Sequence, residues 1–421
     1  MNRPVYERGD ALHEMTSPNA VALAPIAPQE RIQTLDVLRG FAMFGVLWSN
    51  LNTGYGVTAP ESALDEALRW THQTLIAGRF YTLLGFLFGV GFAIQLLRAK
   101  ARRRDPLGFY LRRLAVLLAI GVAHGLLIWR GDILTFYALI GFFLPFYNRL
   151  SSRRLLIAAG ATFFGLSMLQ STANLVLHRG PPVPSIHEDW IYAHGSVGQV
   201  FAQRAHDYVQ WYSWWIISGF AGFLTLFVLG LWVGRSDIVQ ELPARLHTLR
   251  KALVVSVVCC AIGLVLQHNL NAWWPRPTAI PTSWTERVEL VPRFLAGLTA
   301  GSLATWAMSA SYACALTLLY HRDGWSQPLA PLAAVGRMTL TTYLTQSVVC
   351  TLLFYSYGAG WYGHVSFSGM FAIAVVLFAL QMLASTWWVS RYRFGPVEWL
   401  WRSLSYGAKQ PMRLANSLRP R

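Results

Sequence analysis

DVLRGFAMFGVLWSN, residues 36–50, is the stretch that decides the fold, because it places Asp36, Arg39 and Asn50 inside an apolar run of membrane-spanning length. Arg39 and Asn50 are eleven residues apart. Since each residue turns a helix by about 100°, their side chains share one face, with Asn50 about 16 Å further along the axis. Asp36 precedes Arg39 by one turn and joins that face. Charged groups at membrane depth normally line a bundle interior or a wet cavity, so this helix is expected to form one wall of a polar passage.

The composition predicts an all-α integral membrane protein. Hydrophobic residues make up 54% of the 421 residues, charged residues 13%, and the mean hydropathy is +0.38, which is typical of a polytopic membrane protein. About ten transmembrane helices are expected, because ten apolar runs bracket the ~20 residues needed to cross the hydrocarbon. These runs are 36–53, 80–98, 112–129, 133–148, 155–177, 213–234, 252–268, 293–320, 333–355 and 367–389.

Lys and Arg are distributed unevenly between alternate loops, and this asymmetry predicts the orientation. If the N-terminus is cytoplasmic, that side collects the basic run 98–113 and the basic C-terminal tail, and the other side keeps few basic residues. Both termini are therefore expected in the cytoplasm. Residues 1–30 are predicted to be a disordered cytoplasmic tail, 31–407 a single polytopic membrane domain, and 408–421 a basic cytoplasmic tail.

The net charge of +16 follows from the same distribution. Basic residues at helix ends face the anionic inner leaflet, so membrane lipids, and no nucleic acid, are the expected partners. The sequence contains no Walker or dinucleotide glycine motif and no GxSxG elbow, which leaves ATP-driven transport and serine hydrolase chemistry unsupported. No metal site is expected either, since all four cysteines fall within apolar runs and predict small buried hydrophobes: Cys259, Cys260, Cys314 and Cys350.

Three stretches are expected on the outer side. Residues 178–210 and 269–290 are predicted to be loops rich in Trp, Tyr, Pro and His. These aromatic residues form an interfacial belt or, alternatively, stack on a sugar or another flat ligand. Residues 60–79 carry charged residues beside Leu and Trp, which predicts an amphipathic helix lying on the surface.

His124 and Asp132 form the first candidate site. His124 lies near the outer end of the third apolar run, and Asp132 follows a Gly-containing turn that folds the next run back. A carboxylate that holds one imidazole nitrogen makes the other nitrogen a good general base. The alternative is a structural His, with Asp132 capping the next helix. Because Asn50 is expected at the same depth, the three residues are predicted to form a catalytic site.

The second candidate site lies in the cytoplasmic half. Arg39 and Arg337 are both expected there, and the planar, permanently charged guanidinium suits the phosphates of a cofactor. Asp36 either belongs to this site or only neutralises Arg39. Tyr343 and Gln346, in the ninth run, either line the cofactor site or form hydrogen bonds between helices.

Several segments carry a resemblance to a known family, and they are spread over nearly the whole chain: LDVLRGFAMFGVLWSN at 35–50, FYTLLGFLFGVGFAIQ at 80–95, HGLLIWRGDILTFYALIG at 124–141, GRMTLTTYLTQS at 336–347 and FGPVEWLWRSLSYG at 394–407. With these motifs the chain resembles the YeiB-like proteins, a domain of unknown function in the bacterial inner membrane. The resemblance implies a multi-pass protein of the bacterial cell inner membrane.

That family is similar to the transmembrane acyltransferases, which include heparan-glucosaminide N-acetyltransferase and the bacterial enzymes that O-acylate surface glycans. The latter carry an Arg-x10-His motif in an early helix. Here that spacing joins Arg39 to Asn50, and an Asn cannot act as the base. The glucosaminide acetyltransferase has a similar run ending in Asn and uses a His elsewhere. By that analogy His124 is the expected base, and His72, in the predicted outer loop, is its rival.

The resemblance implies a membrane-embedded acyltransferase. It would move an acyl group, with acetyl as the first candidate, from cytoplasmic acyl-CoA (acetyl-CoA) to a periplasmic or lipid-linked glycan-type acceptor. The alternatives are a transporter or flippase that uses the same passage without chemistry, and a non-catalytic scaffold. The sequence leaves open the donor, the acceptor, an acyl-histidine intermediate and the oligomeric state, a homodimer included.

Overall fold

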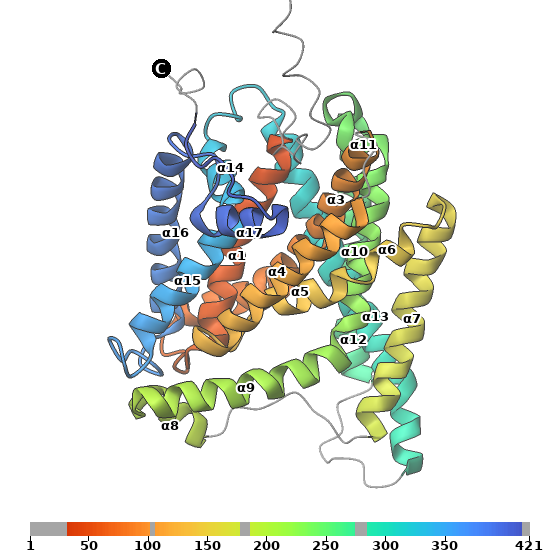
Figure 1. Cartoon of the computed structure of the whole chain (residues 1–421). Helices are drawn as coiled ribbons and strands as arrows, with labels where there is room; N and C mark the ends of the chain where they lie inside the picture. The colour runs from red at the N-terminus through yellow and green to blue at the C-terminus, as the bar shows by residue number, and fades with distance from the viewer. Residues whose placement is uncertain (1–31, 102–105, 177–185, 274–283, 415–421) are drawn as a thin grey trace, which may run out of the picture. The chain divides into compact units, whose positions relative to one another are not determined.

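The computed structural model describes residues 32–101, 106–176, 186–273 and 284–414 (Figure 1). From Thr34 onward the described residues form one compact unit. The predicted tail 1–30 and the middle of the predicted loop 269–290 lie outside the described residues, as does the end of the predicted tail 408–421. Residues 408–414 pack back onto the bundle, because Arg393 N–H donates to the Met412 carbonyl and Leu414 N–H to that of Arg391.

The regular secondary structure of the described residues is helical, apart from two isolated β-bridges. A π-helical turn, η2 (His72–Ile76), joins α2 to α3, and a 3-10 turn, η3 (Leu242–Arg245), precedes α12. The α-helices are α1 (Gln33–Gly54), α2 (Ala63–Thr71), α3 (Arg79–Ala101), α4 (Pro106–Leu127), α5 (Leu134–Gly141), α6 (Leu144–Tyr147), α7 (Ser152–Val176), α8 (Ile186–His194), α9 (Val197–Ser218), α10 (Phe220–Arg235), α11 (Asp237–Gln240), α12 (Leu246–Trp273), α13 (Trp284–Tyr320), α14 (Ala330–Arg337), α15 (Thr339–Phe354), α16 (Phe367–Val389) and α17 (Pro396–Tyr406).

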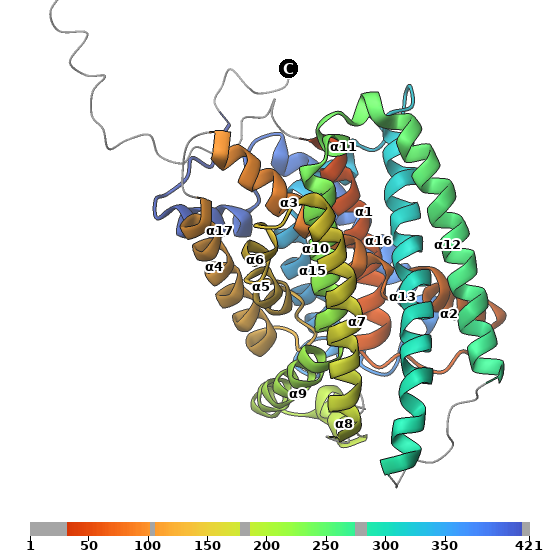
Figure 2. The same ribbon diagram turned by 90° about the vertical axis from the view of Figure 1, so that its right-hand side faces the viewer.

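Five of the described helical stretches are long and apolar enough to cross a membrane: Ala63–Arg98, Leu107–Leu127, Leu242–Leu270, Val291–Tyr320 and Phe367–Val389. Three shorter helices are also apolar: Leu134–Tyr147, Phe220–Arg235 and Thr339–Phe354. Length and composition therefore indicate a multi-pass integral membrane protein. In Figure 2, α12 and α13 run side by side along one flank of this unit.

Some predicted boundaries are wrong. The run 213–234 is divided at Gly219 between α9 and α10, and the run 333–355 is divided at Met338 between α14 and α15. The stretch 178–210, predicted to be a loop, contains α8 and the first part of α9. Helix α9 runs across the ends of the long helices in Figure 1, and its sequence contains polar residues that interrupt any apolar run. The predicted amphipathic helix within 60–79 is confirmed as α2.

The first helix is in backbone contact with α14. A Cβ atom at Gly40 would collide with the Leu332 carbonyl, and a Cβ at Gly336 would collide with the carbonyl of Asp36. Small residues allow helices to approach this closely inside a membrane. The contact brings the end of α14, and with it Arg337, against the Asp36 turn of α1.

A buried carboxylate starts α15 where α14 breaks. Glu398, on α17, accepts the backbone N–H of Leu340 at 2.6 Å and that of Thr341 at 3.1 Å, and it accepts the Thr341 hydroxyl at 2.5 Å. The first N–H groups of a helix have no partner within the helix, and they carry its positive dipole end. Glu398 thus caps α15 from a distant helix, which gives the GPVEW segment a structural role.

We expect Glu398→Ala to destabilise the protein strongly, because it leaves two N–H groups and a hydroxyl without a buried acceptor. Hydrogen bonds to a charged group contribute about 1.5–3 kcal/mol each, so the two backbone N–H groups alone should cost at least roughly 3 kcal/mol of stability. The loss should lower the melting temperature followed by tryptophan fluorescence. Glu398→Gln keeps one acceptor oxygen and should lose less. Glu241→Ala, at an exposed ion pair with Arg245, is the matched control. A Glu398→Ala protein that melts with this control would contradict the capping role.

Candidate functional site

His124 and Asp132 form a buried pair. His124 lies in the last turn of α4 with 2% of its surface exposed, and Asp132 lies in the turn that leads to α5. Nδ1 of His124 is 2.9 Å from Oδ1 of Asp132. The prediction that this turn folds Asp132 back onto His124 is confirmed.

Asp132 makes both of the contacts on which the two alternatives rest. Its Oδ1 holds the imidazole, while its Oδ2 accepts the Thr135 backbone N–H at 2.8 Å in the first turn of α5. Tyr212 of α9 donates to the same carboxylate at 3.0 Å and to the Asp132 carbonyl at 2.7 Å. Three helices therefore converge on this carboxylate, and its position is fixed.

The second imidazole nitrogen of His124 faces away from Asp132. Its Nε2 is buried and has no hydrogen-bond partner among the described residues. With the Nδ1 proton donated to Asp132, Nε2 carries a lone pair that can accept a proton. The Tyr343 ring lies 5.0 Å from the imidazole, and its hydroxyl is 3.3 Å from the Gly131 carbonyl. Tyr343, predicted beside a cofactor, therefore lies in the His124 cluster.

Asn50 reaches this cluster indirectly. Its Oδ1 accepts a hydrogen bond from the Tyr81 hydroxyl of α3, and the Tyr81 carbonyl accepts the Tyr137 hydroxyl at 2.6 Å. Tyr137 belongs to α5, whose first turn is held by the Asp132 carboxylate. The Asn50–Tyr81 pair and the His124–Asp132 pair are thus both attached to α5, although no hydrogen bond between Asn50 and His124 occurs in the described structure.

Further buried polar residues adjoin the His124 turn, and the sequence reasoning missed them. Arg130 forms an ion pair with Asp207 of α9 at 2.6 Å, and Tyr192 of α8 donates to that carboxylate at 2.7 Å. Arg204, which is fully buried, donates to the carbonyl of Leu127 at the end of α4. Arg130 stands in the quoted HGLLIWRGD segment. Arg204 and Asp207 lie in the stretch that was predicted to be a loop.

His72 is not in an exposed loop, and that expectation is wrong. It lies in the π-helical turn η2 with 5% of its surface exposed, and its ring is 5.9 Å from the Trp48 ring. Its Nε2 is buried and has no hydrogen-bond partner in the described part of the chain. His72 thus lacks a carboxylate of the kind that orients His124.

Arginines gather at the opposite end of α1 and α4. Arg39 Nη1 is 3.2 Å from Asp36 Oδ1, and its Nη2 lies beside Gly91 of α3. Arg113 of α4 stacks on the Trp401 ring at 4.0 Å, and the positive charges of Arg39 and Arg402 act on it. Helices α1, α4 and α17 thus each contribute a cation.

Arg113 and His124 are eleven residues apart on α4, as Arg39 and Asn50 are on α1. Each pair therefore shares one helix face and spans about 16 Å along the axis. The Arg-x10-His spacing that the first helix lacks is thus present on α4, and this spacing was the signal that could have identified Arg113. In the sequence, Arg113 stands out only as the last charge of the basic run 98–113.

Gln346 forms a contact between helices. Its Nε2 donates to Gln381 Oε1 of α16 at 2.9 Å, and Gln381 donates in turn to the Thr342 carbonyl at 3.1 Å. Of the two interpretations, interhelical hydrogen bonding therefore describes Gln346 in this structure. Asp36 likewise pairs with Arg39.

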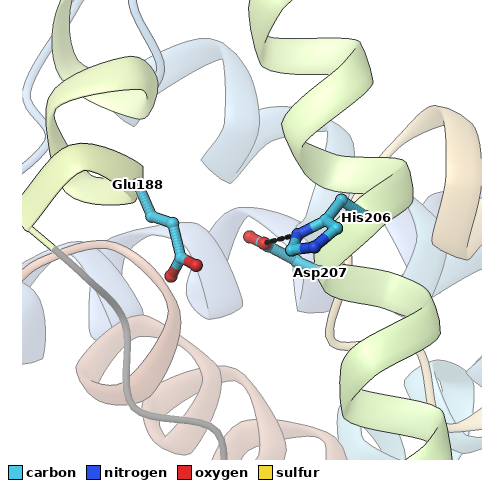
Figure 3. Close-up of side chains that lie close together, drawn as sticks. All are labelled: Glu188, His206 and Asp207. Atoms are coloured by element: carbon cyan, nitrogen blue, oxygen red, sulfur yellow. Dashed lines mark ion pairs between the residues drawn. The ribbon is translucent and has the colours of Figure 1, made fainter.

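Glu188, His206 and Asp207 bring potential metal-ligand atoms within 4.8 Å of one another (Figure 3). The Asp207 carboxylate already accepts hydrogen bonds from Arg130, Tyr192 and Gln203. His206 Nδ1 is 3.6 Å from Asp207, and its side chain is largely exposed. Since the arginine already neutralises the carboxylate, this group links α8 and α9 to the α4–α5 turn and does not fit a metal centre.

Comparison with known proteins identifies the relatives of this chain. Residues 276–408 match the family described as "Protein of unknown function (DUF418)". "Uncharacterized protein YxaH" of Bacillus subtilis is 31% identical over 93% of this chain and 98% of its own length. The "Uncharacterized 39.9 kDa protein in amylase 3'region" of Bacillus acidopullulyticus is 27% identical, with the same coverage of both chains. "Uncharacterized protein YeiB" of Escherichia coli is 28% identical over 91% of this chain and 98% of its own length. The resemblance to YeiB is thereby confirmed, and the chain belongs to the DUF418 family of proteins of unknown function.

Proposed function

We propose that this protein is a membrane-embedded acyltransferase that transfers an acyl group, acetyl first among the candidates, from cytoplasmic acyl-CoA to a glycan-type acceptor at the periplasmic side. The single observation that carries this proposal is the buried His124–Asp132 pair, in which Nε2 of His124 has no partner among the residues that the structure describes. A base that is oriented by a carboxylate and kept from other protein donors is suited to deprotonate a hydroxyl or an amine.

His124 supplies the base. Nε2 takes the proton of the acceptor as its oxygen or nitrogen attacks the thioester carbonyl, and Asp132 stabilises the imidazolium that forms. The C–S bond then breaks, and the CoA thiolate leaves and receives the proton from His124. Asn50 supplies an oxyanion donor: Tyr81 holds its Oδ1, which leaves its amide N–H groups for the oxygen that gains charge.

The arginines at the other end of α1 and α4 supply the phosphate site. Arg39, Arg113 and Arg402 provide permanent cations, and Arg337 lies at the end of the helix that packs on Asp36. Guanidinium groups bind phosphate through paired N–H donors. The ~16 Å rise between the two ends is within the reach of an extended pantetheine arm.

The membrane arrangement that accompanies this function has ten spans with both termini in the cytoplasm. Two helices, α1 and α7, have 22 and 25 residues, and they join the five long apolar stretches. The remaining three spans are α5–α6, the run 213–234 with the end of α9 and most of α10, and α14–α15, each interrupted by a break between helices. Such a break is tolerated in a membrane where neighbouring groups satisfy the backbone, as Glu398 does for α15.

Reporter fusions test the orientation. Fusions at Arg104 and Lys409 should both report the cytoplasm, and a fusion at Gly195 should report the periplasm, because the basic loops lie on the inner side. A cytoplasmic signal at Gly195 would place His124 on the wrong side for a periplasmic acceptor.

His124→Ala should abolish acyl transfer while it leaves CoA binding intact. Loss of a general base lowers a rate by ~10²–10⁴-fold, and Asp132→Asn should lower it less, because it only disturbs the orientation of the ring. The assay is release of CoA thiol from acetyl-CoA by purified protein with a glycan acceptor. His72→Ala, at another buried histidine, is the matched control.

If His124→Ala turns over at a near-normal rate and His72→Ala loses turnover, His72 is the base. If wild-type protein consumes no acyl-CoA, the transporter or flippase takes the place of the enzyme, and glycan uptake into proteoliposomes becomes the assay.

The cation cluster predicts that replacing one of its arginines weakens CoA binding, by an amount that depends on the charge of the new residue. Arg39→Ala and Arg113→Ala should each weaken CoA binding in calorimetry by roughly tenfold, the equivalent of about 1.4 kcal/mol for one lost charge-assisted contact. Arg39→Lys should bind CoA better than Arg39→Ala, because it keeps the charge. Arg245→Ala, at an exposed pair, is the control. Unchanged CoA affinity in folded Arg39→Ala would make the Asp36–Arg39 pair structural.

A further inference from the structure

A polar pocket of about 490 Å³ lies between η2 and the start of α3 on one side and the α12–α13 pair on the other. It shares no lining residue with the His124 cluster or with the arginine cluster. Its polar lining comes from Gln73, Arg79, Gln267, Ser302, Thr305 and Trp306. Helices α12 and α13 run side by side in Figure 2, and both contain stretches of membrane-spanning length.

Arg79 is the cation of this pocket, and its guanidinium is only partly satisfied. Nη1 donates to the Gln73 carbonyl at 3.0 Å and to the carbonyl of Ala77, whereas Nε is buried without a hydrogen-bond partner. Among the residues that the structure describes, no carboxylate forms an ion pair with Arg79. Arg79 is half-buried, and a cation at membrane depth is unfavourable without a counter-ion. The pocket therefore favours an anion.

The other lining groups suit a phosphate. Gln267 supplies an amide, Ser302 and Thr305 supply hydroxyl groups, and Trp306 supplies an indole ring. Together with the guanidinium these are typical donors to phosphate oxygens. Gly297 also lines the pocket, and the space above it is open, because a Cβ at this position would meet nothing within 4 Å.

The surroundings indicate where the phosphate comes from. On α12, Val265 and Leu266 directly precede Gln267 and are 58% and 46% exposed, and Ile262 one turn earlier is 48% exposed. Such a large apolar surface on a membrane-spanning helix faces lipid. The pocket therefore adjoins acyl chains, which would continue along α12 from a headgroup held at Arg79.

We propose that this pocket binds the phosphate group of a membrane lipid, with Arg79 as the charge partner and the lipid chains lying along α12. Lipid binding at this pocket does not depend on acyl transfer at His124. The lipid phosphate would sit against the first turn of α3, two residues before Tyr81, which holds Asn50.

Native mass spectrometry of the full-length protein in detergent tests this proposal, with phosphatidylglycerol as the probe. Wild-type protein should retain phosphatidylglycerol, and Arg79→Gln should weaken this binding by about tenfold or more, the equivalent of one lost hydrogen-bonded charge contact. Arg79→Lys should lose less. Arg250→Gln, in a separate basic pocket at the other end of α12, is the matched control and should retain the lipid.

Gly297→Leu provides a second variant, which keeps Arg79 and places a side chain in the open space of the pocket. It should also weaken lipid binding, and it decides the question if Arg79→Gln proves unstable. Equal retention of lipid by wild type and Gly297→Leu would overturn the proposal. A second arm adds inorganic phosphate in excess. If inorganic phosphate alone binds and displaces the lipid completely, the pocket recognises free phosphate, and the assignment to a lipid fails.

Discussion

The Asp132 carboxylate is the constraint on which the candidate site depends. One oxygen fixes the tautomer and orientation of His124, and the other satisfies the first turn of α5 and the Tyr212 hydroxyl of α9. A buried carboxylate is tolerated only when its lone pairs are satisfied in this way. The geometry of the site therefore depends on the local fold, because the carboxylate that orients the candidate base also joins three helices.

A second buried carboxylate also satisfies the first turn of a helix, at the break between α14 and α15. Glu398 reaches from α17 to cap α15, directly after the end of α14, and this break places Arg337 against the Asp36 turn of α1. Helix α17 also carries Trp401 and Arg402, which adjoin Arg113. The C-terminal segment thus both stabilises the interrupted helix and contributes to the cation cluster.

These features arrange charge along two helices. On α1 and on α4, an arginine at one end shares a helix face with Asn50 or His124 at the other end. Permanent cations are grouped at one end and titratable and neutral groups at the other, which is the arrangement that the proposed acyl transfer needs. The Arg79 pocket is separate from both groups, and its lone cation adjoins a helix with a large apolar exposed surface.

The sequence by itself determined the helical membrane class, the YeiB-like family and the pairing of His124 with Asp132. Apolar run length and local spacing are encoded within a few turns of one helix, so they can be read from the chain. Only the tertiary structure decided that Asn50 pairs with Tyr81, that Tyr343 contacts His124, that Gln346 binds Gln381 and that Arg113 and Arg402 adjoin Arg39. It also revealed α9 as a helix and His72 as a buried residue. Each of these facts depends on contacts between segments distant in the chain, and the periodicity of a single helix does not say which neighbour its polar face will meet.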